Sequence, residues 1–198
     1  MYRPNILLTA FGAFPGVECN PTEIVLEKCI ELEVDSSAFQ LTRAVLDVSY
    51  HRSIEQLYEL LNEHEAFDIV IHLGVAISSD EIRLERQAIN QRSAKIPDID
   101  GVKSNEVPIM ARLPIEYIVQ TTSPLEALEQ KLKKKGIPVR ISQDAGKYVC
   151  NNIYFASLLW QKNAIFVHIP AFGEYWTSAL LTQIVSDIVQ ELCSITQV

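Results

Sequence analysis

Short apolar runs of strand length alternate with segments of helical periodicity along most of the chain. The apolar run at residues 5–9 predicts a buried strand, and the nearly all-apolar run at 68–73 is typical of a central parallel strand. Residues 40–48, 138–142 and 164–169 also have strand patterns. Helical periodicity covers residues 21–32, 50–64, 124–135, 150–162 and 177–193. This order predicts an α/β protein, with residues 1–198 forming a single-domain three-layer α/β/α sandwich around a twisted, mixed, mostly parallel sheet.

Helix starts are indicated by capping signals. Asn20, Pro21 and Glu23 supply an N-cap, a proline at the first helical position and a glutamate three residues after the cap. Ser49 is predicted to cap the second helix, and Ser123 the third by the same device as Asn20. The chain is therefore divided into elements at defined points, without a linker or an internal repeat.

Residues 81–89 alternate in a way that a simple core strand does not. Ile82 and Leu84 lie on one side, whereas Arg83 and Glu85 lie on the other. Because a partly buried carboxylate needs a partner, Glu85 is either paired with a nearby arginine or part of a functional site. Residues 91–108 then form the longest irregular stretch, and a loop of that length in a compact domain is usually functional or mobile.

Composition and charge exclude several function classes. The 198 residues include 25 acidic and 17 basic side chains, a net charge of -8 that disfavours binding to nucleic acid or to anionic lipid. The four cysteines are far apart and form no CxxC pair, so we expect free thiols in a reducing compartment, the cytoplasm. No apolar run has the length of a membrane span, and the first 14 residues are expected to form a strand and a loop instead of a secretory signal.

Cys150 is the candidate nucleophile. It follows a strand and a turn that contains Gly146, and it lies at the predicted start of a helix. A helix N-terminus stabilises anions, so a thiol held there ionises more readily and becomes a nucleophile. On position alone, a small buried hydrophobic side chain is the commoner role for a cysteine, and the other three cysteines keep that interpretation.

A thiolate nucleophile needs a base, and the base needs an orienting partner. Of the four histidines, His51 and His64 are expected to be solvated and His72 to be a hydrogen-bonded core residue. His168 stands near the carboxyl end of a predicted strand, where parallel strands present ligand-binding side chains. Glu85 is the candidate orienting carboxylate, with a structural salt bridge to Arg83 or Arg86 as its alternative.

Three blocks of the sequence, in this order, resemble the signatures of the pyroglutamyl peptidase (pyrrolidone-carboxylate peptidase) family of cysteine peptidases. They are Gly74 with Glu85-Arg86, Ala88 and Asn90; Ile141-Ser142 with Ala145-Gly146 and Tyr148-Val149-Cys150-Asn151; and Phe166-Val167-His168-Ile169-Pro170. The resemblance extends over most of the chain, from about Leu7 to Pro170, and the block around the cysteine is its most specific part.

The resemblance implies a thiol peptidase that removes N-terminal pyroglutamate from peptides through a thioester intermediate. Cys150 would be the nucleophile, His168 the general base and then acid, and Glu85 the residue that orients the imidazole. Backbone N–H groups at the start of the helix would hold the oxyanion. No metal or organic cofactor is implied, and a homo-oligomer, a dimer or tetramer, is expected.

The lactam of pyroglutamate is a small, uncharged ring, so its pocket should be mainly apolar. The resemblance places the substrate-binding residues at Phe11, Phe14, Val75, Lys95, Ile96 and Val149. Without the resemblance, core packing would be the preferred interpretation of the two phenylalanines.

The chain departs from the family pattern at several positions near the site. A glycine-containing stretch that ends in arginine is usual after Gly74, but residues 75–79 are Val-Ala-Ile-Ser-Ser. Arg83, Gln87 and Lys95 also replace commoner residues, and lysine cannot make the bidentate contact of an arginine. Two alternatives follow: a binding protein that keeps the fold without cleaving its ligand, and a cysteine amidase with a different acyl specificity.

Overall fold

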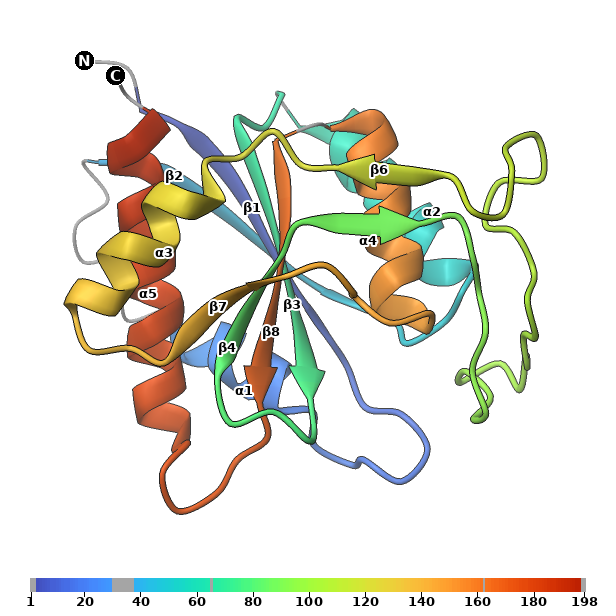
Figure 1. The fold of residues 1–198 in the computed structure, drawn as a ribbon, viewed down its shortest axis with the longest axis horizontal. Coiled ribbons are helices and arrows are strands. Elements are labelled where there is room, and N and C mark those ends of the chain that lie inside the picture. Colours follow the sequence, from blue (N-terminus) through green and yellow to red (C-terminus); the bar gives the residue numbers. More distant parts are fainter. Residues whose placement is uncertain (1–2, 30–37, 65, 162, 197–198) are drawn as a thin grey trace.

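A six-stranded sheet forms the centre of the protein (Figure 1). The computed structural model describes residues 3–29, 38–64, 66–161 and 163–196. The elements follow one another as β1 (Asn5–Phe11), α1 (Pro21–Lys28), β2 (Gln40–Leu46), α2 (Arg52–Glu63), β3 (Ile69–Ala76), β4 (Ile82–Glu85), β5 (Gln87–Ile89), β6 (Ile118–Gln120), α3 (Leu125–Lys134), β7 (Val139–Ser142), α4 (Val149–Trp160), β8 (Ala164–Pro170) and α5 (Ser178–Thr196).

The strands are ordered β2-β1-β3-β8-β4-β7 in this sheet, and β5 and β6 form a separate two-stranded ribbon. Within the large sheet β4 runs antiparallel to β8, and the other neighbouring pairs are parallel. This confirms the predicted mixed, mostly parallel sheet. The apolar runs of the sequence correspond to β1, β3 and β8, which lie inside the sheet and are covered on both faces.

Helices cover both faces of the sheet, which confirms the predicted three layers (Figure 1). One face packs against α1, α3 and α5, and the core on that side includes Ile71, Val167 and Leu84. The other face packs against α2 and α4 around a second core that includes Val70 and Phe166. Alternate residues of β3 and β8 therefore point to opposite layers, and Phe166 and His168 point to the α2/α4 side.

Several local predictions need correction. The segment 81–89 is divided into β4 and β5, because the backbone leaves the large sheet at Arg86 and pairs with β6, a strand that the sequence pattern did not indicate. Ser123 does not cap α3: Pro124 occupies the N-cap, and among the described residues its side chain makes no capping hydrogen bond. The predicted extension of α1 to about Leu32 falls outside the described residues.

The cap predicted for α1 is confirmed, and the one predicted for α2 is displaced. The side chain of Asn20 accepts a hydrogen bond from the backbone N–H of Thr22 at 3.1 Å, with Pro21 in the first helical position. His51, not Ser49, is the N-cap of α2, but the Ser49 hydroxyl accepts hydrogen bonds from the N–H groups of His51 and Arg52 just before the helix. These caps satisfy backbone donors that an α-helix leaves unpaired at its start.

Candidate active site

Cys150 occupies the second position of α4, at the carboxyl end of the parallel strands. The turn before it is closed by Gly146, which has a φ of 76° and whose N–H donates to Asp144 Oδ1 at 2.9 Å. Tyr148 is the N-cap, and its side chain makes no capping hydrogen bond with any described residue. The first backbone N–H groups of α4, which point out of the helix, are thus left to act on a negative charge near the Cys150 sulfur.

Gly74 brings the backbone of β3 directly beneath Cys150. A Cβ added at this residue would lie 3.1 Å from Cys150 Sγ and 2.6 Å from Cε1 of Phe166. Only glycine leaves enough space here, because Cys150 and the ring of Phe166 both lie against this residue. Gly74 also pairs in register with His168 of β8, so the residue closest to Cys150 Sγ lies beside this histidine in the sheet.

His168 and Glu85 form a buried pair on adjacent antiparallel strands. Nδ1 of His168 lies 2.8 Å from Oε1 of Glu85; the histidine is 7% exposed and the glutamate 0%. In β8 and β4, Phe166 is opposite Glu85 and His168 is opposite Arg83, so the two side chains meet diagonally on the α4 side of the sheet.

The protonated form of His168 is favoured. Burial by itself lowers the pKa of this imidazole, but hydrogen bonds with Cys150 and Glu85, and the negative charges of these two groups, outweigh it and raise the pKa to about 9. The imidazole therefore lies next to both the Cys150 thiol and the Glu85 carboxylate, and its raised pKa favours the charged form at neutral pH. Cys150, His168 and Glu85 are thus brought together in the order that a nucleophile, a base and an orienting group require.

The alternative ion pairs proposed for Glu85 are absent from the described residues. Arg86 pairs instead with Glu126 at the start of α3, and Arg83 donates a hydrogen bond to Ser79 at 3.1 Å. The backbone carbonyl of Glu85 accepts a hydrogen bond from the hydroxyl of Tyr154 at 2.7 Å. Burial, and then the charge of Glu85, raise the pKa of Tyr154, so this phenol remains a neutral donor that holds the strand in place.

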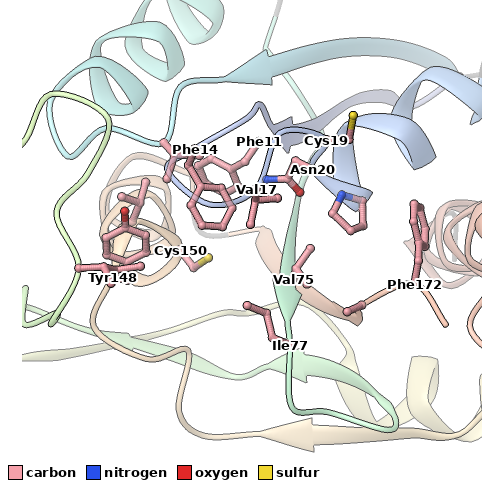
Figure 2. A pocket seen from close by; sticks show the side chains of 15 residues that line it. Phe11, Phe14, Val17, Cys19, Asn20, Val75, Ile77, Tyr148, Cys150 and Phe172 are labelled. Atoms are coloured by element: carbon pink, nitrogen blue, oxygen red, sulfur yellow. The ribbon is translucent and has the colours of Figure 1, made fainter.

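A cavity of about 490 Å³ opens beside Cys150 (Figure 2). The described residues that line it include no Lys, Arg, His, Asp or Glu. The predicted substrate contacts that line it together with Cys150 are Phe11, Phe14, Val75, Ile96 and Val149. Lys95 is not among them: it is exposed and lies along a separate hollow with Lys103 and Asn105.

Tyr148 also lines the cavity, although the sequence analysis gave it no role beyond its place in the cysteine block. Its hydroxyl donates to the backbone carbonyl of Pro97 at 2.9 Å, and its ring packs edge-on against Tyr50 with centroids 5.7 Å apart. The guanidinium of Arg92 lies 5.3 Å from the centre of the Tyr50 ring. Tyr148 therefore ties the irregular segment that carries Ile96 to the helix that carries Cys150.

The remaining histidines lie away from Cys150. His51 and His64 are exposed, as expected. His72 is fully buried, and its Nδ1 lies 2.6 Å from the hydroxyl of Thr9, but its Nε2 has no partner among the described residues. Burial lowers the pKa of His72 to about 3, so this histidine is neutral. The prediction of a hydrogen-bonded core histidine is confirmed for one of its two nitrogens.

The four cysteines are free thiols, which confirms the prediction made from their spacing. Cys29 and Cys193 are buried, and burial raises the pKa of each to about 11. Cys19 is exposed at the edge of the cavity. Cys150 therefore differs from the other three in lying beside a histidine, His168, whose pKa it helps to raise.

Two further properties bear on function. Within the described ranges, no group of three or more histidine, cysteine, aspartate and glutamate residues has an arrangement suited to holding a metal ion. None of the helices in those ranges combines the length and the apolar character needed to cross a membrane.

Known proteins with similar sequences and structures point to one family. The family model described as pyroglutamyl peptidase matches residues 4–189. Pyrrolidone-carboxylate peptidase of Brevibacillus brevis is 36% identical over 177 residues, 86% of this chain and 80% of the relative; that of Pyrococcus furiosus is 34% identical over 176 residues, 86% and 82%.

Solved structures give the same result. A mutant pyrrolidone carboxyl peptidase from P. furiosus superimposes with a TM-score of 0.86 at 28% identity, covering 96% of this chain and 98% of the other. The enzyme from Fervidobacterium islandicum superimposes with a TM-score of 0.83 at 32% identity and the same coverage. The likeness therefore includes the complete sheet and both helical layers.

Proposed function

Because the chain belongs to the pyroglutamyl peptidase family of cysteine hydrolases, we propose that it removes pyroglutamate from the N-terminus of peptides, with Cys150, His168 and Glu85 as its catalytic triad. The observation that carries this proposal is the buried pair of His168 and Glu85, with Nδ1 2.8 Å from Oε1, next to Cys150 and a mainly apolar cavity. Glu85 acts on Nδ1 of His168, which leaves Nε2 to exchange a proton with the substrate.

In the acylation step, the thiolate of Cys150 attacks the carbonyl carbon that joins the lactam ring to the next residue. The oxygen of that carbonyl becomes negative and is stabilised by the first backbone N–H groups of α4. The C–N bond then breaks, and the departing nitrogen takes its proton from the His168 imidazolium. The raised pKa of His168 suits this role, because the group holds a proton to give at neutral pH.

In the deacylation step, His168 is neutral and accepts a proton from water as the water oxygen attacks the thioester carbonyl. The C–S bond breaks, the thiolate of Cys150 is restored with the imidazolium beside it, and free pyroglutamate leaves. Glu85 compensates the positive charge that His168 carries at the start and end of the cycle. The cycle balances without a further reactant.

The lactam ring fits the part of the cavity lined by Phe11, Phe14, Ile96 and Val149. Val149 and Phe11 are buried and rigidly packed, whereas Ile96 is 51% exposed and belongs to the segment that Tyr148 holds. An apolar wall of this kind excludes an N-terminal ammonium group or a free glutamate side chain, because either charge would be buried without a partner.

The proposal is tested by hydrolysis of a pyroglutamyl amide that releases a fluorescent amine. The reduced protein should release the fluorophore, and Cys150→Ala and thiol alkylation should abolish the release. Cys193→Ala is the matched control, since it removes a buried thiol from the opposite face of the sheet and should keep activity. Saturable binding of a pyroglutamyl peptide with no product would instead support a binding protein and refute the peptidase.

Two expectations on setting belong to the same proposal. Four free cysteines, one of them the nucleophile, suit a reducing compartment such as the cytoplasm, because an oxidised Cys150 cannot attack. The chain would also act as a homo-oligomer. Size-exclusion chromatography with light scattering tests the second expectation, and a monomer that retains full activity would contradict it.

A further inference from the structure

The cavity beside Cys150 is larger than a pyroglutamyl group requires. Its volume of about 490 Å³ lies in the range of pockets for drug-sized ligands, whereas the pyroglutamyl group is a single small ring. The four residues assigned to the lactam ring also make up only part of the lining of the cavity. The remaining walls must therefore face water or another part of the substrate.

The lining continues on both sides of the nucleophile (Figure 2). Tyr148 lies on one side of Cys150 with Phe14 above the thiol in this view, which is the part assigned to the ring, and Ile77 and Phe172 lie on the other side. We call this second side the leaving-group arm and define it by Val75, Ile77, Ala171, Phe172, Pro21 and Cys19. It comes from the end of β3, the segments that follow β3 and β8, and the chain at and just before the start of α1.

The pairing of β3 with β8 puts the leaving-group arm next to His168, where we expect the second residue of the substrate. Gly74 is opposite His168, and the next residues of the two strands, Val75 and Ile169, are also paired, so both chains leave the sheet side by side beyond the histidine. The amine that departs from the thioester must reach His168 to take its proton. The residue attached to that amine therefore starts beside His168 and extends toward Ile77 and Phe172.

The chemistry of the arm is apolar. Ile77 is 72% exposed and Phe172 37%, so both present hydrophobic surface to water in the free protein. Asn20 contributes the one side-chain amide of the lining, but it is engaged as the N-cap of α1 and donates to the carbonyl of Gly12 at 3.0 Å. The described lining holds no Lys, Arg, His, Asp or Glu with which a charged substrate side chain could pair.

We propose that Ile77 and Phe172 form a specificity pocket for an apolar residue directly after pyroglutamate, so that the preferred substrates are pyroglutamyl peptides with leucine or phenylalanine in second place. This proposal rests on the proposed function, since it concerns the leaving group of that reaction. Burial of the second side chain against these two residues supplies binding energy that is available in the transition state.

A series of pyroglutamyl dipeptide amides tests the proposal, with the released amino-acid amide measured by liquid chromatography. The leucine and phenylalanine substrates should have a kcat/KM about tenfold above the glycine substrate, and the aspartate and lysine substrates should fall below glycine. Ile77→Asn and Phe172→Ser should lower kcat/KM for the leucine substrate about fivefold to tenfold. The value for the glycine substrate should stay within about twofold, because glycine has no side chain that contacts these two residues.

Ile118→Asn and Tyr117→Ser are the matched controls. Both residues are similarly exposed hydrophobic side chains, 45% and 43%, and neither lines the cavity. Equal kcat/KM values for leucine, glycine and aspartate in the unmodified protein would overturn the proposal, whether or not the variants fold. So would variants that lose leucine and glycine activity to the same extent. Cleavage of none of the substrates is a separate result, which refutes the proposed function and this inference with it.

Discussion

Gly74→Ala tests whether the close approach of β3 to the nucleophile is a requirement of the fold and of the reaction. The added Cβ would lie 2.6 and 2.7 Å from two carbons of the Phe166 ring and 3.1 Å from Cys150 Sγ. Carbon atoms in contact normally lie about 3.5–4.0 Å apart, so roughly 1 Å of movement is needed. The positions of the neighbouring groups decide what can move.

The ring of Phe166 cannot retreat freely. It is fully buried, and its centroid lies 4.7 Å from that of His168, 5.7 Å from that of Tyr154 and 6.5 Å from that of Phe11. Overpacking of this kind costs about 1–3 kcal/mol, and for a chain of this length each kcal/mol lowers Tm by about 2–4 °C. Any shift that relieves the contact moves Cys150 or His168, and a displacement near 1 Å costs about 10²-fold in rate.

The experiment measures thermal unfolding and kcat/KM on the fluorogenic pyroglutamyl amide in parallel. Gly173→Ala is the matched control, because a Cβ there meets nothing within 4 Å and it should change neither quantity. Phe166→Leu in the Gly74→Ala background should restore part of the lost stability, so the two substitutions should be non-additive. A Gly74→Ala protein with the Tm and kcat/KM of the unmodified chain, or additive effects in the double variant, would refute the reasoning.

Three further predictions concern the titrating groups. First, kcat/KM should fall as pH rises through about 9, because above the raised pKa of His168 the imidazole has no proton for the departing amine; a profile flat to pH 10 would contradict this. Second, Glu85→Gln should lower kcat by about 10²–10⁴ and move that alkaline limb to lower pH, since the charge that helps to raise the pKa of His168 is removed. Third, the pKa of His72 is about 3 in the folded chain, below its ordinary value of about 6.5, so the unfolded state binds the extra proton between these values. The free energy of unfolding, measured by chemical denaturation, should therefore lose nothing to His72 above about pH 6.5. Below that pH it should fall by up to about 1.4 kcal/mol per pH unit toward about pH 3. The non-titrating His72→Gln should have a shallower slope, and equal slopes would show that other groups cause the loss.

The layers of the fold could be predicted because buried strands and amphipathic helices have different hydrophobic periods. The β5–β6 ribbon could not, since β6 has three residues of mixed exposure and no alternation long enough to detect. Ser123 has the residue type of an N-cap, but the helix begins one residue later than that signal indicates, with Pro124 in the cap position. Hydrophobic periodicity and capping residues thus predict where most helices and strands lie, whereas the exact residues at which these elements begin and end depend on tertiary packing.

For the site, Cys150 and His168 could be placed from local sequence because each stands at the carboxyl end of a parallel strand or at the helix that follows one. The partner of Glu85 could not be chosen from the residues alone. An arginine lies two residues before Glu85 and another directly after it, whereas His168 is 83 residues away and becomes a neighbour only because β4 joins the sheet antiparallel to β8. Strand order is a long-range property, so the resemblance was needed to make that choice.

The departures from the family pattern bear on specificity more than on chemistry. Arg83 bonds to Ser79, and Gln87 donates to the carbonyl of Gln143, so among the hydrogen bonds of the described residues neither side chain reaches the His168–Glu85 pair. The altered stretch after Gly74 forms the wall of the leaving-group arm through Val75 and Ile77. Substitution there leaves the positions of Cys150, His168 and Glu85 unchanged, and it changes the surface that we propose meets the second residue of the substrate. A family member that differs at these positions should therefore keep the reaction and differ in which peptides it cleaves fastest.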